Sequence, residues 1–412
     1  MYKTHRPFSL VNVQNIPKEE NNKTSENDSE TQINQHRLVE EGKEKAVGWW
    51  LLLTAGTVFF MIILGGYTRL SHSGLSMVRW RPINYVLPSS TEEWETEYEQ
   101  YKLFPEYQLS PETCDMKHFK FIFFIEWAHR TLGNIIGVEF TFPMVYFWAR
   151  GYLKRPMKLR LAGLFCFGLT QGLVGWWMVK SGLTAKPDYQ SRPRVSTYRL
   201  FVHLNNAIII YSFLLWNGLT LVSPKQESIL SLKNFKHCEK VRKITICIIA
   251  ALALNVMSGV TVAGIDAGKV FNTWPLMNGA FMPNGYWKWG LGWRNCFENL
   301  SCAQFNHRNL AYVTYALSTY ALFRYGNLPI PLKSKRALIL LFIAVNYQLA
   351  IGIYLVLNQV PLFWGCNHQA NGLVTLSLAI ALLNGVRRPN PAHLAKLRNL
   401  YKIQGANKIS NL

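Results

Sequence analysis

Residues 126–130 read Glu-Trp-Ala-His-Arg and lie in an apolar run that is rich in aromatic residues. On a helix, the carboxylate of Glu126 and the imidazole of His129 share one face, and Arg130 follows directly. One helical turn therefore carries an acid or base, a metal ligand and a partner for anions. The pattern returns at residues 304–308 as Gln-Phe-Asn-His-Arg, with an amide in place of the acid.

Eight apolar segments approach the length of about 20 residues that a helix needs to cross a hydrocarbon core. The mean hydropathy of +0.04 hides them, because polar connectors dilute the average. Runs of this length and spacing do not suit a large soluble core. The sequence therefore predicts an all-α, polytopic membrane protein with eight transmembrane helices. The segments are roughly 47–67, 119–149, 159–180, 198–222, 241–264, 302–323, 337–357 and 362–386.

The net charge of +21 is carried by basic clusters that alternate with the predicted helices. Such clusters do not form the continuous basic face expected of a protein that binds nucleic acid, so we expect no nucleic-acid partner. By the positive-inside rule, basic connectors face the cytoplasm-equivalent side, and both termini are therefore predicted on the matrix side. The clusters fall at residues 43–45, 150–160, 225–243, 324–336 and 387–402.

The second part of the chain repeats the first. His307 repeats His129 at a shift of 178 positions (307 minus 129), and His368 repeats His203. We expect two repeated four-helix bundles with parallel topology, because four is even and the second copy enters the membrane from the same side. The predicted division is an N-terminal tail (1–45), a first half (46–222), a basic connector (223–240), a second half (241–388) and a basic C-terminal tail (389–412).

The four histidines indicate a cofactor, since ionisable groups inside a membrane are costly and usually functional. A lone histidine on an apolar helix is often only hydrogen-bonded, but these four are paired by the repeat. The sequence places beside them no cluster of Cys or carboxylates, as a zinc or di-iron site would need. Imidazoles that face each other across a bundle suit axial ligation of haem. Candidate partners for haem propionates are Arg69, Arg130 and Arg308.

The two halves differ in one residue that matters for chemistry. Glu126 can move protons or stabilise cationic charge beside a porphyrin edge, whereas Gln304 cannot titrate. The first half is therefore predicted to hold the substrate, and the second half a resident cofactor. A structural interpretation of Glu126 also stays open, namely a buried ion pair with Arg130 or Arg69.

Three further segments have a recognisable character. Residues 1–18 are basic and lack acids, as in a mitochondrial targeting segment. Residues 19–45 are polar and non-periodic, which predicts disorder. The connector 76–118 carries three aromatic residues at helical spacing among glutamates, which predicts an amphipathic helix in the membrane interface that acts as a lid or brace. These aromatic residues are Trp94, Tyr98 and Tyr101.

Taken together, these motifs make the chain resemble the haem A synthases of the mitochondrial and alphaproteobacterial type. The resemblance covers roughly residues 47–386 and rests on several motifs in the expected order. They are residues 126–130, 171–183, 193–200 leading to His203, 263–268, 304–308 and 368–369.

The resemblance implies that the C8 methyl group of haem O is oxidised to the formyl group of haem A, through successive hydroxylations and loss of water. It implies that His129 and His203 hold the substrate or product haem, and that Glu126 serves the oxidation. His307 and His368 would ligate a resident haem b that passes electrons.

The resemblance also implies a place and partners. The place is the mitochondrial inner membrane, with several membrane passes and the haem sites toward the intermembrane space. The partners are the lipid bilayer, a haem O farnesyltransferase, a ferredoxin-type electron donor, cytochrome c oxidase assembly factors and further copies of the chain in a homo-oligomer. Some bacterial members carry a Cys pair in the first outer loop, where this chain has Cys114 alone. Cys296 and Cys302 share a later connector and can pair, but the odd total of seven Cys argues against a disulfide framework.

Two other functions remain open at this point. A membrane electron carrier would hold two equivalent haem b groups, each between two histidines, and would leave them chemically unchanged. A haem chaperone for oxidase assembly would transfer haem even after loss of the resident cofactor.

Overall fold

The computed structural model describes residues 37–79, 86–109, 114–184, 194–223 and 232–388. Within these residues the regular structure is helical, and β pairing is confined to isolated bridges such as Val39 with Leu153. The long helices are α2 (Glu44–Leu70), α5 (Met116–Ala149), α6 (Arg155–Leu183), α7 (Thr197–Val222), α8 (Leu232–Gly264), α10 (Leu300–Tyr325), α11 (Leu332–Leu357) and α12 (Leu362–Gly385).

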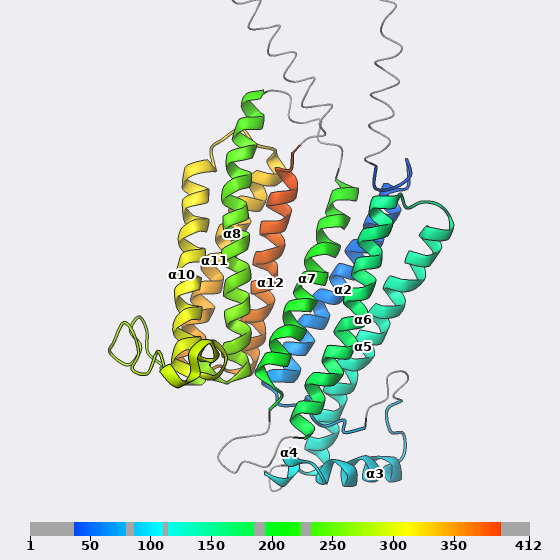
Figure 1. Cartoon of the computed structure of the whole chain (residues 1–412), viewed down its shortest axis with the longest axis vertical. Coiled ribbons are helices and arrows are strands. Elements are labelled where there is room, and N and C mark those ends of the chain that lie inside the picture. Colours follow the sequence, from blue (N-terminus) through cyan, green and yellow to red (C-terminus); the bar gives the residue numbers. More distant parts are fainter. Residues whose placement is uncertain (1–36, 80–85, 110–113, 185–193, 224–231, 389–412) are drawn as a thin grey trace, which may run out of the picture.

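Short helices fill the connectors. α3 (Thr91–Lys102) and α4 (Pro105–Gln108) lie between α2 and α5. η2 (Ala267–Lys269), η3 (Trp289–Arg294) and α9 (Asn295–Glu298) lie between α8 and α10. All of them gather at one end of the long helices, and the described chain ends at residues 37 and 388 lie at the other end (Figure 1).

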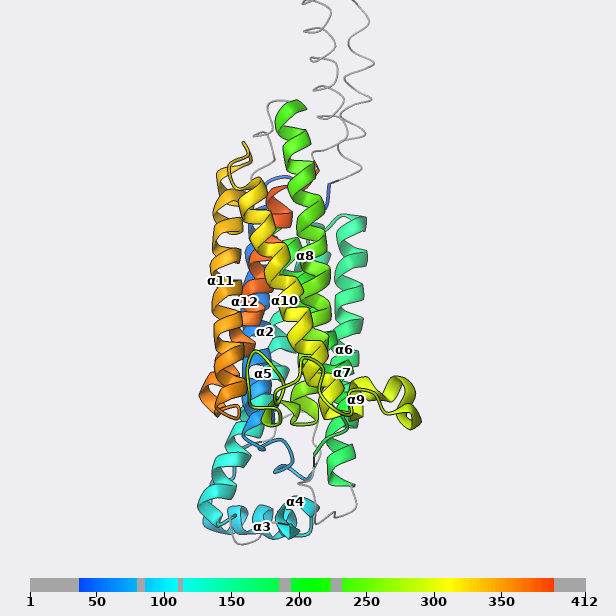
Figure 2. The same ribbon diagram turned by 90° about the vertical axis from the view of Figure 1, so that its left-hand side faces the viewer.

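The long helices form two side-by-side groups of four (Figures 1 and 2). In the first group, α2 packs on α5 and α7, and α6 packs on the same two helices, so that α5 and α7 stand diagonally opposite. In the second group, α8 and α11 each pack on α10 and α12, which are the diagonal pair there. Each group has its own buried apolar cluster. This order places α5 facing α7, and α10 facing α12, across the two bundle interiors.

The groups meet along α2, α7, α8 and α12. Hydrogen bonds cross this boundary at several depths: Tyr211 and Ser377 share one of 2.6 Å, and Asn384 donates to Thr220 over 2.8 Å. Gln369 donates to the backbone carbonyl of Ile62 over 2.7 Å. The two groups therefore form a continuous packed unit.

Among the described residues, five helices are long and apolar enough to cross a membrane, namely α2, α6, α7, α8 and α11. The other three long helices, α5, α10 and α12, each carry polar residues of the predicted site, which lowers their apolar content. The chain is thus an all-helical, multi-pass membrane protein.

The long helices cover the predicted apolar segments, with one clear difference. α8 begins at Leu232 rather than near residue 241, so the described part of the predicted basic connector is helical. The reason is an apolar stripe within the basic sequence: Cys238 and Val241 are buried in the core of the second group. The predicted targeting segment and the C-terminal tail at 389–412 lie outside the described residues. The predicted disorder of residues 19–45 is wrong for residues 37–45, because Val39 is buried and pairs with Leu153, and α2 begins at Glu44.

α3 forms where an amphipathic helix was predicted, but its apolar side does not face lipid. Trp94 stacks edge-on against Phe123 of α5, with ring centres 5.3 Å apart. Tyr101 packs on Phe119 at 5.0 Å and is buried. Protein contacts use this apolar face, so α3 is a brace for the start of α5, which is one of the two predicted roles. Its position in the membrane interface stays a prediction.

Candidate functional site

The four histidines occupy the diagonal helices of the two groups. His129 lies on α5 and His203 on α7, while His307 lies on α10 and His368 on α12. The rings of His307 and His368 have centres 6.3 Å apart. His129 and His203 lie near each other across the first group. The fold therefore brings together each of the two pairs that the repeat predicted.

Each histidine ring rests on a glycine of a neighbouring helix. A Cβ atom built on Gly65 of α2 would lie 3.0 Å from Cε1 of His129, and one on Gly259 of α8 would lie 3.0 Å from that of His307. Real Cβ contacts are rarely so short, so these positions accept no larger residue without movement of the ring. Gly175 under His203, at 3.0 Å, and Gly352 under His368, at 3.3 Å, complete the set.

A chain of two amides holds one histidine of each pair. In the first group, Asn206 donates to Oε1 of Gln171 over 2.9 Å, and Nε2 of Gln171 lies 3.3 Å from Nε2 of His203. In the second group, Asn371 donates to Gln348 over 2.7 Å, and Gln348 lies 3.2 Å from Nε2 of His368. Such outer contacts fix the orientation of a metal-binding imidazole.

The residues present fit a haem iron held between the histidines. Among the described residues, Nδ1 of His129, of His203 and of His368 is buried without a hydrogen-bond partner, so each ring keeps unused bonding capacity in the bundle interior. His307 instead places Nδ1 2.9 Å from the hydroxyl of Ser258, which leaves its Nε2 for a metal. A metal about 2 Å from each of two imidazole nitrogens needs ring centres about 6 Å apart, close to the spacing of the second pair.

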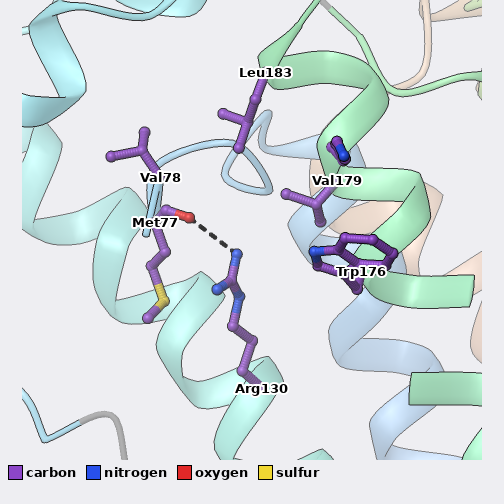
Figure 3. Close-up of a pocket in the computed structure, with 7 residues that line it drawn as sticks. Met77, Val78, Arg130, Trp176, Val179 and Leu183 are labelled. Carbon is purple, nitrogen blue, oxygen red and sulfur yellow. Dashed lines mark hydrogen bonds between the residues drawn. The ribbon is translucent and has the colours of Figure 1, made fainter. Parts of the chain in front are cut away.

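Glu126 holds the loop that follows α2. Its side chain is 2% exposed. Oε1 accepts a hydrogen bond of 2.5 Å from Arg130, while Oε2 accepts from the hydroxyl of Ser76 and the backbone N–H of Met77, both at 2.8 Å. Arg130 also donates to the carbonyl of Met77 over 3.0 Å (Figure 3). The ion pair with Arg130 that the sequence left open is therefore present.

Gln304 holds the corresponding loop of the second group with the opposite hydrogen-bond polarity. Its amide nitrogen donates to the carbonyls of Ala267, over 3.1 Å, and of Val270, over 2.6 Å. Arg308 donates to the carbonyl of Phe271 over 2.7 Å, as Arg130 does to that of Met77. The carboxylate and the amide thus brace equivalent loops by different means.

The third predicted arginine lies at the boundary between the groups. Arg69 donates to the carbonyl of Gly264 over 3.2 Å and to Asp266 over 3.4 Å. Arg194 and Lys269 also approach Asp266, at 3.5 and 3.9 Å. All three predicted arginines thus have protein partners in this structure.

A pocket of about 150 Å³ opens between the loop after α2 and helix α6. Val78 and Arg130 line one side, with Trp176 and Val179 opposite (Figure 3). Lys180 completes the wall, and its ammonium lies 5.2 Å from the centre of the Trp176 ring.

The cysteines form no disulfide in the described residues. Cys114 is buried, and burial raises the pKa of its thiol, which disfavours the reactive thiolate. Cys296 and Cys302, which could have paired, are both free thiols.

The sequence identified the four histidines, Glu126 and Gln304, but missed the parts that position them. The glycine seats and the Asn–Gln chains lie on helices whose pattern is apolar. Their signal was present in the repeat, because Gly175 and Gln171 recur as Gly352 and Gln348 at one shift. Ser76 and Lys180 carried no such signal.

Comparisons with known proteins agree on one family. A family model described as cytochrome oxidase assembly protein, COX15-CtaA, matches residues 48–380. Heme A synthase COX15 of Bos taurus is 39% identical over 355 residues, which cover 85% of this chain and 84% of the relative. The human protein of the same name is 39% identical over 360 residues, 85% of each chain. Heme A synthase of Sinorhizobium fredii is 39% identical over 359 residues, 83% of this chain and 91% of the relative.

Proposed function

The chain belongs to this family of cytochrome oxidase assembly proteins, and from that premise we propose how its two histidine pairs divide the work of making haem A. The activity is the oxidation of haem O to haem A for cytochrome oxidase. This activity favours an enzyme over the electron carrier and over the haem chaperone.

We propose that the first group binds haem O and releases haem A. Two observations support this assignment. The carboxylate of Glu126 lies one helical turn from His129, whereas the second group has an amide there. A pocket that Arg130 and Trp176 line opens in the same group. His129 and His203 would hold the substrate iron, and the haem supplies the redox chemistry when bound.

Glu126 would then serve the oxidation from a fixed position. Oε1 is held by Arg130, so Oε2 is the atom that can take up a proton, after release of Ser76 or Met77. A carboxylate beside a bound porphyrin would also stabilise positive charge that develops there. Arg130 keeps the side chain aimed and holds the loop, while Arg69 and Arg308 would help to bind propionates.

We propose that the second group, within residues 241–388, holds a resident haem b between His307 and His368. The ring spacing and the hydrogen bond from His307 to Ser258 support this assignment. Electrons would come from a ferredoxin-type donor, haem O from a farnesyltransferase, and haem A would pass to oxidase assembly factors. A homo-oligomer in the bilayer is part of the same proposal.

We further propose that all eight long helices cross the mitochondrial inner membrane, with both termini in the matrix. The connectors after α5 and α10 are basic and lie at the same end as residues 37 and 388 (Figure 1). The positive-inside rule assigns that end to the matrix. The histidines would then lie toward the intermembrane space, and residues 1–18 would direct import.

The test is haem extraction from membranes that express the chain together with a supply of haem O. We expect haem A with the native chain, and only haem O and haem B without it or with the His129→Ala variant. Haem B alone with the native chain, despite available haem O, would instead support the electron carrier.

A further inference from the structure

The loop that follows the first helix is held differently in the two groups, and the histidines do not explain the difference. Asn272 follows η2, and its side chain donates to the backbone carbonyl of Val356 on α11 over 2.7 Å. This bond ties the loop directly to the helix. Arg308 holds the same loop from the other side through the carbonyls of Phe271 and Thr273.

The first group has a pocket at the equivalent place. Two positions establish the equivalence: Gly65 and Gly259 seat matching histidines, and so do Gly175 and Gly352. At the sequence shift that relates Gly65 to Gly259, Val78 corresponds to Asn272. The shift that relates Gly175 to Gly352 gives the next two correspondences. Val356 corresponds to Val179, and Leu357 corresponds to Lys180.

The corresponding residues therefore line a pocket in one group and join the loop to the helix in the other. Val78 and Val179 face the pocket, where an apolar pair makes no bond like that between Asn272 and Val356. A cation, Lys180, replaces the leucine. An apolar cleft with a cation at its wall suits a flat apolar molecule that carries a carboxylate.

Two residues that line the pocket are sequence neighbours of the first histidine site. Arg130 follows His129 directly in the sequence, and Trp176 follows Gly175, on which His203 rests. With about 150 Å³, the pocket can take one edge of a porphyrin and not the whole ring. Lys180 is placed by its contact with the Trp176 ring, so its charge stays at the pocket wall.

We propose that this pocket binds a propionate-bearing edge of the porphyrin substrate, with Lys180 as a specificity-determining residue. The inference rests on the proposed function, since it assigns the substrate to the first group. It adds that the first group selects a porphyrin by its free carboxylate. The second group has Leu357 in place of Lys180, and the hydrogen bond from Asn272 joins its loop to α11, so it does not bind a porphyrin carboxylate in this way.

The experiment compares two probes, ferric protoporphyrin and its dimethyl ester, which differ only in the carboxylates. Each is titrated by its Soret absorbance into holoprotein in nanodiscs of neutral phosphatidylcholine. The native protein should bind the diacid about fivefold more tightly than the diester, the effect of one charge-assisted hydrogen bond near a partly exposed site. Lys180→Leu should remove this preference by weakening the diacid alone, and the matched variant Lys158→Leu on the same helix should keep it.

Three results would overturn the proposal: a native protein without preference for the diacid, a Lys180→Leu variant that keeps the preference, or equal weakening of both probes by that variant. A preference seen only with anionic lipid in the nanodiscs would assign the pocket to a lipid headgroup instead. The resident haem spectrum checks folding of each variant.

Haem A production is measured separately, so the two proposals can fail independently. Haem A without any probe preference would overturn the pocket and leave the function standing. A probe preference that depends on Lys180, without haem A, would keep a porphyrin carboxylate site and overturn the function. Val78→Asn offers a second check, because an amide there should bridge to α6 and weaken both probes.

Discussion

The two histidine pairs lie in the same helical frame, yet their loops are braced with opposite polarity. In the first group a carboxylate accepts hydrogen bonds from the loop, through Ser76 and Met77. In the second group the amide of Gln304 donates to the loop, at Ala267 and Val270. Both side chains are 2% exposed, so the two braces are equally sheltered from water.

This comparison distinguishes a structural role of Glu126, which is to brace the loop, from a role in the reaction. An uncharged side chain is enough to brace the loop in the second group, so bracing alone does not require a charge. Burying a carboxylate with an arginine is expensive unless the pair is well bonded, and such pairs seldom add net stability. The charge of Glu126 therefore supports its proposed role in the reaction. The open pocket in the first group and the bridged loop of the second agree with the proposal that the first site exchanges its haem and the second retains it.

The largest expected effect separates the two pairs themselves. His307→Ala should remove the resident haem b and abolish haem A production, because the electron path is lost. His129→Ala should also abolish haem A but leave the resident haem b and its spectrum. Absorbance spectra of the purified variants, with haem extraction from the same membranes, check both outcomes. Equal loss of haem b from both variants would contradict the division of roles.

The Glu126→Gln substitution gives the first group the amide that the second group has at Gln304. The amide can still accept from Met77 through its oxygen, so the loop and both haems should remain. Haem A production should fall by about a hundredfold or more, the usual contribution of a positioned acid or base. Chromatography of extracted haems gives the yield, and the haem content of the purified variant shows whether binding is intact. Near-native yield would reduce Glu126 to a brace.

A smaller effect, on the free energy of unfolding, is expected from a substitution at the contact between the two groups. Gly66 of α2 lies against Gln369, and a Cβ there would clash with its Oε1. Gly66→Ala should therefore displace the Gln369 side chain and lower the free energy of unfolding by about 2 kcal/mol, a typical cost of overpacking. The equivalent position in the second group is Val260, whose larger side chain is buried.

The control for this variant is Gly56→Ala on the same helix. No atom lies within 4 Å of a Cβ at Gly56, so alanine should be neutral or slightly stabilising there. Thermal unfolding in detergent compares the two. Similar stability of both variants would show that the contact between Gln369 and α2 does not hold the groups together.

The sequence predicted the fold well because membrane helices have a strong signal. Apolar runs of about 20 residues depend on the bilayer and not on distant contacts. The start of α8 was misplaced for the same reason: a basic segment was read as a connector, although Cys238 and Val241 pack into the second core. The helix of α3 was predictable from its aromatic spacing, but its packing partners on α5, Phe119 and Phe123, were not.

The histidine pairs were predictable because each stands out on an apolar helix and recurs in the repeat. Their supports were not, because they are tertiary. Nothing local in Gly65 shows that His129 will rest on it, and nothing in Ser76 shows that its hydroxyl will reach Glu126 across 2.8 Å. The pocket is lined by Val78, at the position where Asn272 of the second group donates a hydrogen bond to Val356. This difference becomes visible only when the two groups are compared.

The smallest expected effect concerns the Asn–Gln pairs that hold His203 and His368. It tests whether these pairs contribute equally to haem binding in the two groups. Gln348→Leu removes the contact with His368, and Gln171→Leu removes the one with His203. If the second group holds a resident haem, Gln348→Leu should change the spectrum and reduction potential of that haem without releasing it. Gln171→Leu should leave that spectrum unchanged and weaken added haem about fivefold, since one hydrogen bond is worth about 1 kcal/mol.

The same pair of variants can also contradict the comparison. Both amides are anchored alike, by Asn371 at 2.7 Å and by Asn206 at 2.9 Å, so their local surroundings give no reason for different outcomes. A difference must then come from which site keeps its haem. If both variants alter the resident spectrum equally, two resident haems are present, and the first group is not an exchange site. If only Gln348→Leu does so, the asymmetry at Glu126 and at the pocket extends to the haems themselves.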